Sequence, residues 1–274
     1  AADASAKANH VTVKDGVHFT DEVRKRQADF IAARVREIIL EHDVSKLMGS
    51  KPIVDLQPNP AVVPAMRTDP WGAANWMNCH EAILRAKAAG NPKIVFIGDS
   101  ITHFLGGNPE TAGNHGGAFW NTVCDKVGGS GLNLGIGGDQ TQHILWRLDH
   151  GELDGISPKY VVLMAGINNI LWNTNTNADD IVAGVREIVL RIRAKTPGAK
   201  LILMGLLPCH NPATHPRRQL AVKVNEGLKK LAEEGKMPFL DLGAKFLDAN
   251  GNIPPSLMND AVHPTPDGYK FWSE

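Results

Sequence analysis

Three side chains in this sequence could together form an activated nucleophile. Ser100 follows an apolar run at 94–97 and the pair Gly-Asp, while Asp260 and His263 lie three residues apart near the end of the chain. A serine hydroxyl attacks a carbonyl carbon when a histidine accepts its proton, and that histidine needs a carboxylate to orient it. The sequence therefore predicts Ser100 as the nucleophile, His263 as the general base and Asp260 as the residue that orients His263.

The elements that must position these groups alternate between strand and helix from residue 93 onward. Strands that alternate with helices pair in parallel and have both faces of the sheet covered, which favours a three-layer α/β/α fold of the flavodoxin-like type. Ligands bind such sheets beyond the carboxyl ends of the strands. Ser100, Gly138 and Asn168 each follow an apolar run by a few residues, so we expect all three at one edge of the sheet. The predicted strands are 94–97, 132–134, 160–164, 201–204 and 239–242, and the predicted helices between them are 141–148, 178–194 and 217–234.

The sequence predicts an N-terminal helical extension and arm at 1–90 and an α/β domain at 91–274, which carries the predicted nucleophile and base. Apolar residues recur at three- and four-residue spacing after Thr20 and Asp21, which is the pattern of a capped amphipathic helix. The parts of the extension are this helix at 20–42, a Pro-rich arm at 46–75 that Trp71 and Trp76 pack down, and a short helix at 81–89.

The composition narrows the classes of function. Lys plus Arg and Asp plus Glu are 29 each, so no net charge attracts the chain to nucleic acid or to an anionic membrane. No apolar run approaches the roughly 20 residues of a membrane span. The first residues, rich in Ala, suit the mature side of a cleaved signal segment and favour a secreted or periplasmic location. Residues 271–274 read as the opening turns of a last helix.

Four segments of the chain resemble the conserved blocks of the SGNH, or GDSL-type, hydrolase family. They are Gly-Asp-Ser at 98–100, Asn-Leu-Gly-Ile-Gly-Gly-Asp at 133–139, Gly-Ile-Asn-Asn at 166–169 and Asp-Ala-Val-His at 260–263. Within this family, the run at 132–148, the segment 205–208 and the segment 223–225 are similar to the catalytic subunits of platelet-activating-factor acetylhydrolase. The resemblance covers about residues 93–272, and four blocks in order are a specific signal.

The resemblance implies the remaining site residues. The backbone N–H groups of Ser100 and Gly138 and the side-chain amide of Asn168 are expected to form the oxyanion hole, in which each fixed donor is worth about 3–4 kcal/mol. A glycine at 138 lets the substrate approach the main chain without a Cβ in the way. The family has Asp where this chain has Asn169, so Asn169 is a candidate for substrate contact only. No cofactor and no metal ion are expected.

Other polar residues near these blocks have less specific expectations. His103, three residues after the nucleophile, could face the substrate or lie on a helix surface. Asp99 and Asp139 are expected to brace turns, and Trp146 and Arg147 to pack and pair structurally. The Gly-rich insert at 106–120 directly follows the nucleophile, so we expect it to overhang the site and shape a subsite.

Two other kinds of site are disfavoured. The glycines at 135–138 lack the third glycine of a dinucleotide-binding loop, and no acidic residue ends the following strand. None of the 11 histidines has the H-E-x-x-H spacing of a zinc hydrolase, and His210 and His215 fall in a Pro-rich loop as solvated side chains. The three cysteines share no metal-type spacing and are expected to be small buried residues.

Together these patterns predict a serine esterase that hydrolyses short-chain esters, acetyl esters above all. The loops expected at the site are rich in Gly, Asn, His and Trp, which suits a polar alcohol and favours O-acetyl groups on carbohydrate. Two alternatives stay open at this point: a phospholipid or platelet-activating-factor-like acetylhydrolase, and a non-catalytic sugar-binding or scaffold protein. The oligomeric state is also open, a homodimer included.

Overall fold

The computed structural model of the 274-residue chain describes residues 59–69, 73–106, 115–173 and 175–274. Contacts group Pro58–Glu274 into one compact unit, which holds the sheet and all the elements below. The helix expected over 20–42, Trp71 and most of the expected insert at 106–120 lie outside the described residues. The division between residues 1–90 and 91–274 stays a prediction.

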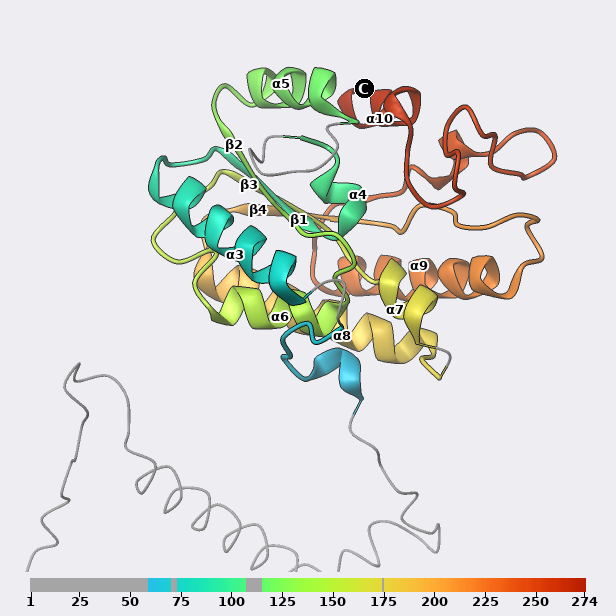
Figure 1. Ribbon diagram of the computed structural model, residues 1–274, viewed down its shortest axis with the longest axis horizontal. Helices are drawn as coiled ribbons and strands as arrows, with labels where there is room; N and C mark the ends of the chain where they lie inside the picture. Colours follow the sequence, from blue (N-terminus) through green and yellow to red (C-terminus); the bar gives the residue numbers. More distant parts are fainter. Residues whose placement is uncertain (1–58, 70–72, 107–114, 174) are drawn as a thin grey trace, which may run out of the picture. The chain divides into compact units, whose positions relative to one another are not determined.

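A five-stranded parallel sheet in the order β2-β1-β3-β4-β5 forms the centre of the unit (Figure 1). All five residues of β1 are buried, as expected for a strand that pairs on both sides in a sheet covered on both faces. The pairing registers bring Gly98, Gly135 and Met164 into one row at the carboxyl ends of their strands. The strands are β1 (Ile94–Gly98), β2 (Gly131–Gly135), β3 (Tyr160–Met164), β4 (Lys200–Met204) and β5 (Phe239–Leu240).

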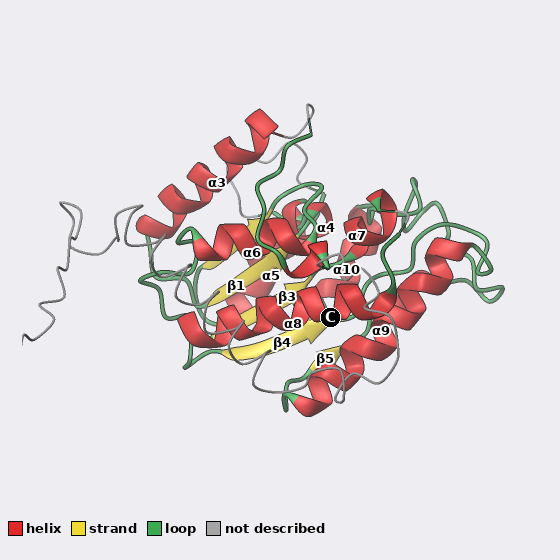
Figure 2. Cartoon of the chain, turned by 90° about the horizontal axis from the view of Figure 1, so that it is seen from below, coloured by secondary structure: helices red, strands yellow, loops and turns green. Residues whose placement is uncertain are grey.

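Helices cover both faces of this sheet, so the predicted three-layer α/β/α class is confirmed. In Figure 1, α5 and α10 lie on one face and α6, α8 and α9 on the other, and Figure 2 shows the second group in front of the strands. The helices after β1 are α4 (Ser100–His103), α5 (Gly117–Lys126), α6 (Thr141–Asp149), α7 (Ile167–Trp172), α8 (Ala178–Lys195), α9 (Pro216–Glu234) and α10 (Pro266–Ser273), with a 3-10 turn η2 at Gly243–Phe246.

Three predicted elements differ from the structure by more than one residue at an end. The expectation that 271–274 are the opening turns of the last helix was wrong, because α10 starts at Pro266 after the Thr265 N-cap and ends at Ser273. The prediction of a strand through residue 242 was wrong at its end, because β5 stops at Leu240 and the Asp241 carboxylate then accepts from the N–H of Gly243, which starts the turn into η2. The helix predicted at 81–89 is α3 (Ala73–Ala88) and starts eight residues earlier. Trp76 belongs to this helix rather than to the arm, and it is only 1% exposed.

The segment 59–69 is fixed to the helical layer by specific hydrogen bonds. Asn59 caps the 3-10 turn η1 (Pro60–Val62), and its side chain also donates to the carbonyl of Asp180 at 3.0 Å. The Thr141 hydroxyl donates to the Ala61 carbonyl at 2.9 Å, and the N–H of Ala65 donates to the Gln142 carbonyl at 3.1 Å. The segment is therefore held against the starts of α6 and α8.

Within the described residues, no helix has both the length and the apolarity to cross a membrane. Cys124 and Cys209 are buried, as predicted, and burial raises the pKa of both thiols. Cys79 is half-buried.

A glycine in α8 allows the close contact between the helical layer and the segment 59–69. A Cβ at Gly184 would lie 2.6 Å from both the Ala61 carbonyl oxygen and the Thr141 hydroxyl. We therefore expect Gly184→Ala to lower the free energy of unfolding by about 1–3 kcal/mol despite the better helix propensity of alanine. Urea unfolding measures this change. Gly198→Ala is the matched control, since a Cβ there meets no described atom within 4 Å, and an equal effect of both substitutions would contradict the packing argument.

Candidate active site

The turn after β1 presents Ser100 at the start of α4. Asp99 is the N-cap of this short helix, and its carboxylate accepts from the N–H of Ile101 at 3.0 Å, which is the bracing role expected for it. Gly98 is required here, because a Cβ would come within 2.2 Å of the Thr102 hydroxyl. The N–H of Ser100 belongs to the first turn of a helix, where N–H groups have no intrahelical acceptor, so it remains available to a ligand.

The Asp99 carboxyl is fully buried and strongly perturbed. Burial raises its pKa from 3.8 to about 7, the N–H of Ile101 opposes the rise, and the charge of Asp139 adds to it. Its second oxygen, Oδ2, has no hydrogen-bond partner among the described residues.

Ser100, His263 and Asp260 form one hydrogen-bonded series. The Ser100 Oγ lies 2.8 Å from His263 Nε2, and His263 Nδ1 lies 2.6 Å from an Asp260 carboxylate oxygen. The other Asp260 oxygen accepts from the backbone N–H groups of Val262 and His263 at 2.9 and 2.7 Å. Burial acts to raise the pKa of Asp260, but these N–H donors and the His263 ring outweigh it and hold the pKa below its usual value. Asp260 is therefore ionised and aimed at the imidazole.

Hydrogen bonds from two distant side chains, Asn133 and Tyr269, fix the segment that carries Ser100. The buried Asn133 amide donates to the carbonyls of Thr102 and Gly106, each at 2.7 Å. The Tyr269 hydroxyl of α10 donates to the carbonyl of Ile101 at 2.6 Å. The position of Ser100 thus depends on β2 and on the last helix as well as on its own turn.

The glycine-rich loop after β2 lies against Ser100. A Cβ placed on Gly137 would lie 3.8 Å from the Ser100 Cβ and 3.9 Å from His103 Nδ1. Gly138 has φ +80°, a conformation that favours glycine. No described residue accepts a hydrogen bond from the Gly138 N–H, so this group is available to the site.

His103 lies beneath this loop and is 8% exposed, so it is not on a helix surface open to solvent. Its Nδ1 accepts from the N–H of Gly137 at 3.2 Å. Burial, followed by the charge of Arg147, lowers the pKa of His103 from 6.5 to about 4. The ring is therefore neutral at ordinary pH and acts as a hydrogen-bond acceptor for the loop.

Asn168 and Asn169 have different surroundings. The Asn168 amide donates to the Asp139 carbonyl at 2.9 Å, and its Oδ1 accepts from Trp172 Nε1 at 3.1 Å. Since a primary amide has two N–H groups, one remains for a ligand at the loop. Asn169 is 3% exposed and holds the start of α6: its Oδ1 accepts from the Thr141 N–H, and its amide donates to the Thr141 hydroxyl. This geometry gives Asn169 a structural contact rather than a substrate contact.

A fully buried group of charges anchors the loop after Gly138. The Arg147 guanidinium donates to Asp139 at 2.8 Å, to Glu152 and to the Leu134 carbonyl at 2.9 Å. Trp76 Nε1 donates to the other Asp139 oxygen at 2.6 Å. Burial alone would lower the pKa of Arg147, but the charges of Glu152 and Asp139 outweigh it and raise the pKa. The structural roles expected for Asp139 and Arg147 match these contacts.

A hollow of about 320 Å³ adjoins Gly138, and sequence reasoning did not single out its main features. Arg67 reaches it from the N-terminal segment, with its guanidinium 5.6 Å from the centre of the Trp172 ring. Trp172 is 59% exposed at the end of α7. No local pattern could have identified Arg67, because the contact that links it to the site, with the Gly137 carbonyl, joins residues 70 positions apart. The hollow is lined by Arg67, Thr68, Asp69, Gly138, Gln140, His143, Trp172 and Asn173.

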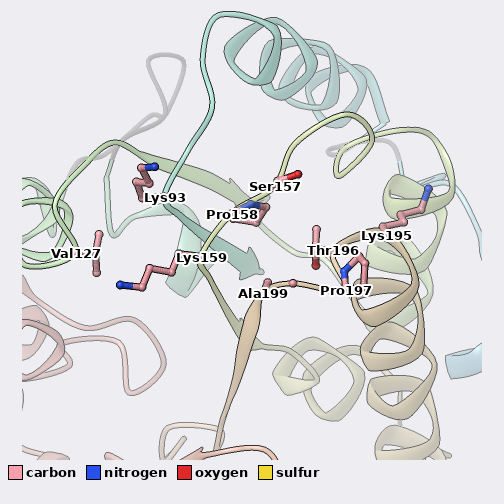
Figure 3. A pocket seen from close by; sticks show the side chains of 10 residues that line it. Lys93, Val127, Ser157, Pro158, Lys159, Lys195, Thr196, Pro197 and Ala199 are labelled. Atoms are coloured by element: carbon pink, nitrogen blue, oxygen red, sulfur yellow. The ribbon is translucent and has the colours of Figure 1, made fainter.

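A separate hollow of about 470 Å³ lies at the other edge of the sheet (Figure 3). Its residues Lys93, Lys159 and Ala199 directly precede β1, β3 and β4, whereas Ser100 follows the carboxyl end of β1. Strands of five residues at about 3.3 Å per residue separate the two edges. This hollow is therefore not part of the Ser100 site.

The loop before α9 joins the rim of the site. The N–H of His210 donates to the Ala261 carbonyl at 2.9 Å, next to the segment that carries His263. Its ring lies 4.5 Å from that of His215, and its buried Nδ1 has no partner among the described residues. The expectation of a solvated loop side chain thus holds only in part for His210, which is half-buried. Across the described ranges, no three His, Cys, Asp or Glu side chains are grouped to hold a metal ion.

Comparisons with known proteins find one family and several relatives. Residues 96–271 match the model of the GDSL-like lipase/acylhydrolase family. The rat platelet-activating factor acetylhydrolase IB subunit alpha2 is 34% identical over 212 residues, covering 77% of this chain and 86% of the relative. The human alpha1 subunit is also 34% identical over 212 residues, which are 77% of this chain and 85% of that subunit.

Solved structures give the same result. A GDSL-like lipase from Bacteroides thetaiotaomicron superposes with a TM-score of 0.55 at 25% identity, covering 72% of this chain and 93% of that one. An acetylxylan esterase from Geobacillus stearothermophilus superposes with a TM-score of 0.54 at 25% identity, covering 67% and 92%.

The depressed pKa of His103 predicts a pH-dependent stability difference between the wild type and His103→Asn. The unfolded chain binds a proton on this histidine near pH 6.5, whereas the folded chain binds it only near pH 4. As the pH falls between these values, the wild type loses stability relative to the variant, by at most about 1.4 kcal/mol per pH unit. Urea unfolding at several pH values in this window measures the difference. The prediction concerns the free energy of unfolding of the wild type minus that of His103→Asn. If this value stays constant or increases toward acid pH, the neutral, buried ring is contradicted.

Proposed function

Because the chain belongs to the GDSL-like lipase/acylhydrolase family, we propose that it is a serine esterase that hydrolyses short-chain esters, acetyl esters above all. The observation that carries the proposal is the series Ser100 Oγ, His263 Nε2 and Asp260, with distances of 2.8 and 2.6 Å. These are the distances at which a base can take a proton from a nucleophile while a carboxylate holds the base in place.

In the proposed reaction, the Ser100 oxygen attacks the ester carbonyl carbon and its proton passes to His263 Nε2. The carbonyl oxygen becomes an oxyanion, which the N–H groups of Ser100 and Gly138 and the amide of Asn168 stabilise. The C–O bond to the alcohol then breaks, and His263 returns the proton to the leaving oxygen. Water, deprotonated by His263, attacks the acyl-enzyme. The bond between the acyl carbon and the Ser100 oxygen breaks, the acid is released, and His263 returns the proton to the Ser100 oxygen. Asp260 stays ionised throughout and stabilises the imidazolium, consistent with its lowered pKa.

For the substrate, we propose O-acetyl groups on carbohydrate. The exposed Trp172 ring offers an apolar face beside the polar side chains of Gln140, His143 and Asn173 in the hollow next to Gly138. A sugar presents C–H faces and hydroxyl groups, which match such a combination. The charged Arg67 and Asp69 in the same hollow disfavour a long apolar chain there. The similarity to an acetylxylan esterase supports the same choice.

The second candidate substrate is a phospholipid or platelet-activating-factor-like acetyl ester, favoured by the 34% identity to the acetylhydrolase subunits. A non-catalytic sugar-binding or scaffold protein is the alternative from another class, and the intact hydrogen-bonded series argues against it. A secreted or periplasmic location and a homodimer stay predictions.

The proposal predicts the substrate profile of the wild type and of Ser100→Ala. We expect the wild type to hydrolyse p-nitrophenyl acetate faster than the butyrate and octanoate, and acetylated xylo-oligosaccharides faster than an alkyl-acetyl-glycerophosphocholine. Ser100→Ala should lower kcat by about 10⁴-fold or more, since the nucleophile is lost. Release of p-nitrophenol and of acetate measures these rates.

Ser256→Ala is the control for this experiment, because Ser256 is an exposed serine outside the site. Faster turnover of the phospholipid would replace the carbohydrate proposal with the second candidate. Turnover that survives in Ser100→Ala would overturn the serine mechanism.

A further inference from the structure

We propose that Arg67 is a positioning residue of the oxyanion hole, which holds the Gly137–Gly138 peptide so that the Gly138 N–H faces the reacting carbonyl. This inference rests on the proposed function, in which that N–H stabilises the oxyanion. Arg67 lies outside the segment 96–271 that matches the family model, so the family motifs do not include it.

The geometry of one peptide unit couples Arg67 to the Gly138 N–H. Arg67 Nη1 donates to the Gly137 carbonyl oxygen at 2.5 Å. The Gly137 C=O and the Gly138 N–H belong to the same planar trans peptide, so they point in opposite directions. Fixing the carbonyl on one side therefore fixes the direction of the N–H on the other side. A Cβ at Gly138 would lie 2.2 Å from Nη1, which shows how closely the guanidinium packs on this peptide.

The loop on either side of this peptide is also held. The N–H of Gly137 donates to His103 Nδ1, and the Asp139 carbonyl accepts from the Asn168 amide. The N–H of Asp139 donates to the Ile136 carbonyl at 3.2 Å. With these groups hydrogen-bonded, the peptide between Gly137 and Gly138 could still rotate if its carbonyl were free. Arg67 binds this carbonyl and so opposes the rotation.

The positive charge of Arg67 also acts on the peptide between Gly137 and Gly138. A cation at the carbonyl end of a peptide polarises it and makes its N–H a stronger donor, and this effect is larger where water is excluded. Arg67 is 5% exposed, so its charge acts on the peptide with little screening by solvent. The Asp69 carboxylate accepts hydrogen bonds from Nε of Arg67 and, at 3.2 Å, from Nη2 of Arg67. Its negative charge compensates the burial of the guanidinium charge, and the two bonds fix the plane of the guanidinium.

Arg67 is itself held in place by its own segment and by Trp172. The segment that carries it is bound to the carbonyl of Asp180 through Asn59 and to α6 through Ala61 and Ala65. The Trp172 ring lies against the guanidinium, with 5.6 Å between Cζ and the ring centre. Arg67 is therefore delivered to the loop by a fixed segment rather than by a long free side chain.

A direct substrate-binding role is the rival, because Arg67 also lines the hollow beside Gly138. The two roles differ in the kinetic constant that they change. A group that binds substrate and transition state equally changes KM, whereas a group that aligns an oxyanion donor changes kcat.

The test measures hydrolysis of p-nitrophenyl acetate by Arg67→Gln and Arg67→Lys. We expect Arg67→Gln to lower kcat by about 10-fold to 100-fold, less than the loss of a direct donor, with KM changed by less than about 3-fold. Arg67→Lys keeps the charge and one donor, so it should recover part of kcat. Arg186→Gln is the matched control, since Arg186 is an exposed arginine that pairs with Glu234 on the surface, and its kcat should equal that of the wild type.

A second readout is inhibition by trifluoroacetone. The Ser100 oxygen adds to the ketone carbon, its proton passes to His263, and the ketone oxygen becomes an oxyanion in the hole. The inhibition constant should rise in Arg67→Gln by the same factor as kcat/KM falls, because both depend on the oxyanion. A purely structural effect of the substitution would lower the fraction of folded enzyme without changing this constant.

The outcomes separate this inference from the proposed function. If Ser100→Ala is inactive while Arg67→Gln keeps the wild-type kcat, the inference is wrong and the proposed function stands. A rise in KM at unchanged kcat also overturns it, in favour of substrate binding. Activity that survives in Ser100→Ala overturns both. If Arg67→Gln does not fold, Arg67→Met takes its place, since it keeps an apolar stem but neither the charge nor the donor. An inhibition constant equal to that of the wild type together with an unchanged kcat in this variant overturns the inference.

Discussion

The catalytic edge of this protein depends on a buried cation, the guanidinium of Arg147. It is fully buried, so its charge must be compensated inside the protein, and the carboxylates of Asp139 and Glu152 do this. His80 contacts Glu152 at 2.7 Å and Trp76 binds Asp139, which ties α3 into the same group. Removal of one partner from such a group costs about 3–5 kcal/mol, because the remaining charges are left buried and uncompensated. Asp139 directly follows Gly138, so the pairing of Asp139 with Arg147 limits where the glycine-rich loop can lie. A loop held in this way keeps its N–H groups fixed, and fixed donors are what an oxyanion hole requires.

The site thus combines a half built on buried histidines with a half whose side chains are more open to solvent. In the first half, burial keeps His103 and His143 neutral, with pKa values of about 4, so that both rings can accept hydrogen bonds from backbone N–H groups. The other half is the loop that carries Asp260 and His263, whose side chains are 52% and 29% exposed. In the proposed mechanism, fixed donors stabilise the developing charge, whereas the base exchanges protons with the alcohol and with water. The two requirements then fall on different segments, the loop after β2 and the loop that carries Asp260 and His263.

Much of this arrangement could be predicted from the sequence, because it depends on local patterns. Apolar runs located four strands to within a residue, and the four blocks located Ser100, Gly138, Asn168 and the Asp260–His263 pair at the edge that the structure shows. The rest depends on contacts between distant segments. Trp76 and His80 carry the i, i+4 spacing of α3, but the reason for their burial is Asp139 and Glu152, more than 60 residues away. Arg67 has no motif of its own, and only its contact with Gly137 makes it relevant. The short β5 ends where the Asp241 side chain starts a turn, which periodicity does not reveal.

In the proposed reaction, Ser100 carries the acyl group between the attack on the ester and the attack by water. Peptide mass analysis of the enzyme, quenched in acid during turnover of p-nitrophenyl acetate, tests this role most directly. We expect one added acetyl group on the peptide that contains Ser100, in an amount that decays as the substrate is exhausted. An acetyl group on His263 or on another residue at turnover-competent rates, with Ser100 unmodified, would contradict this role of Ser100.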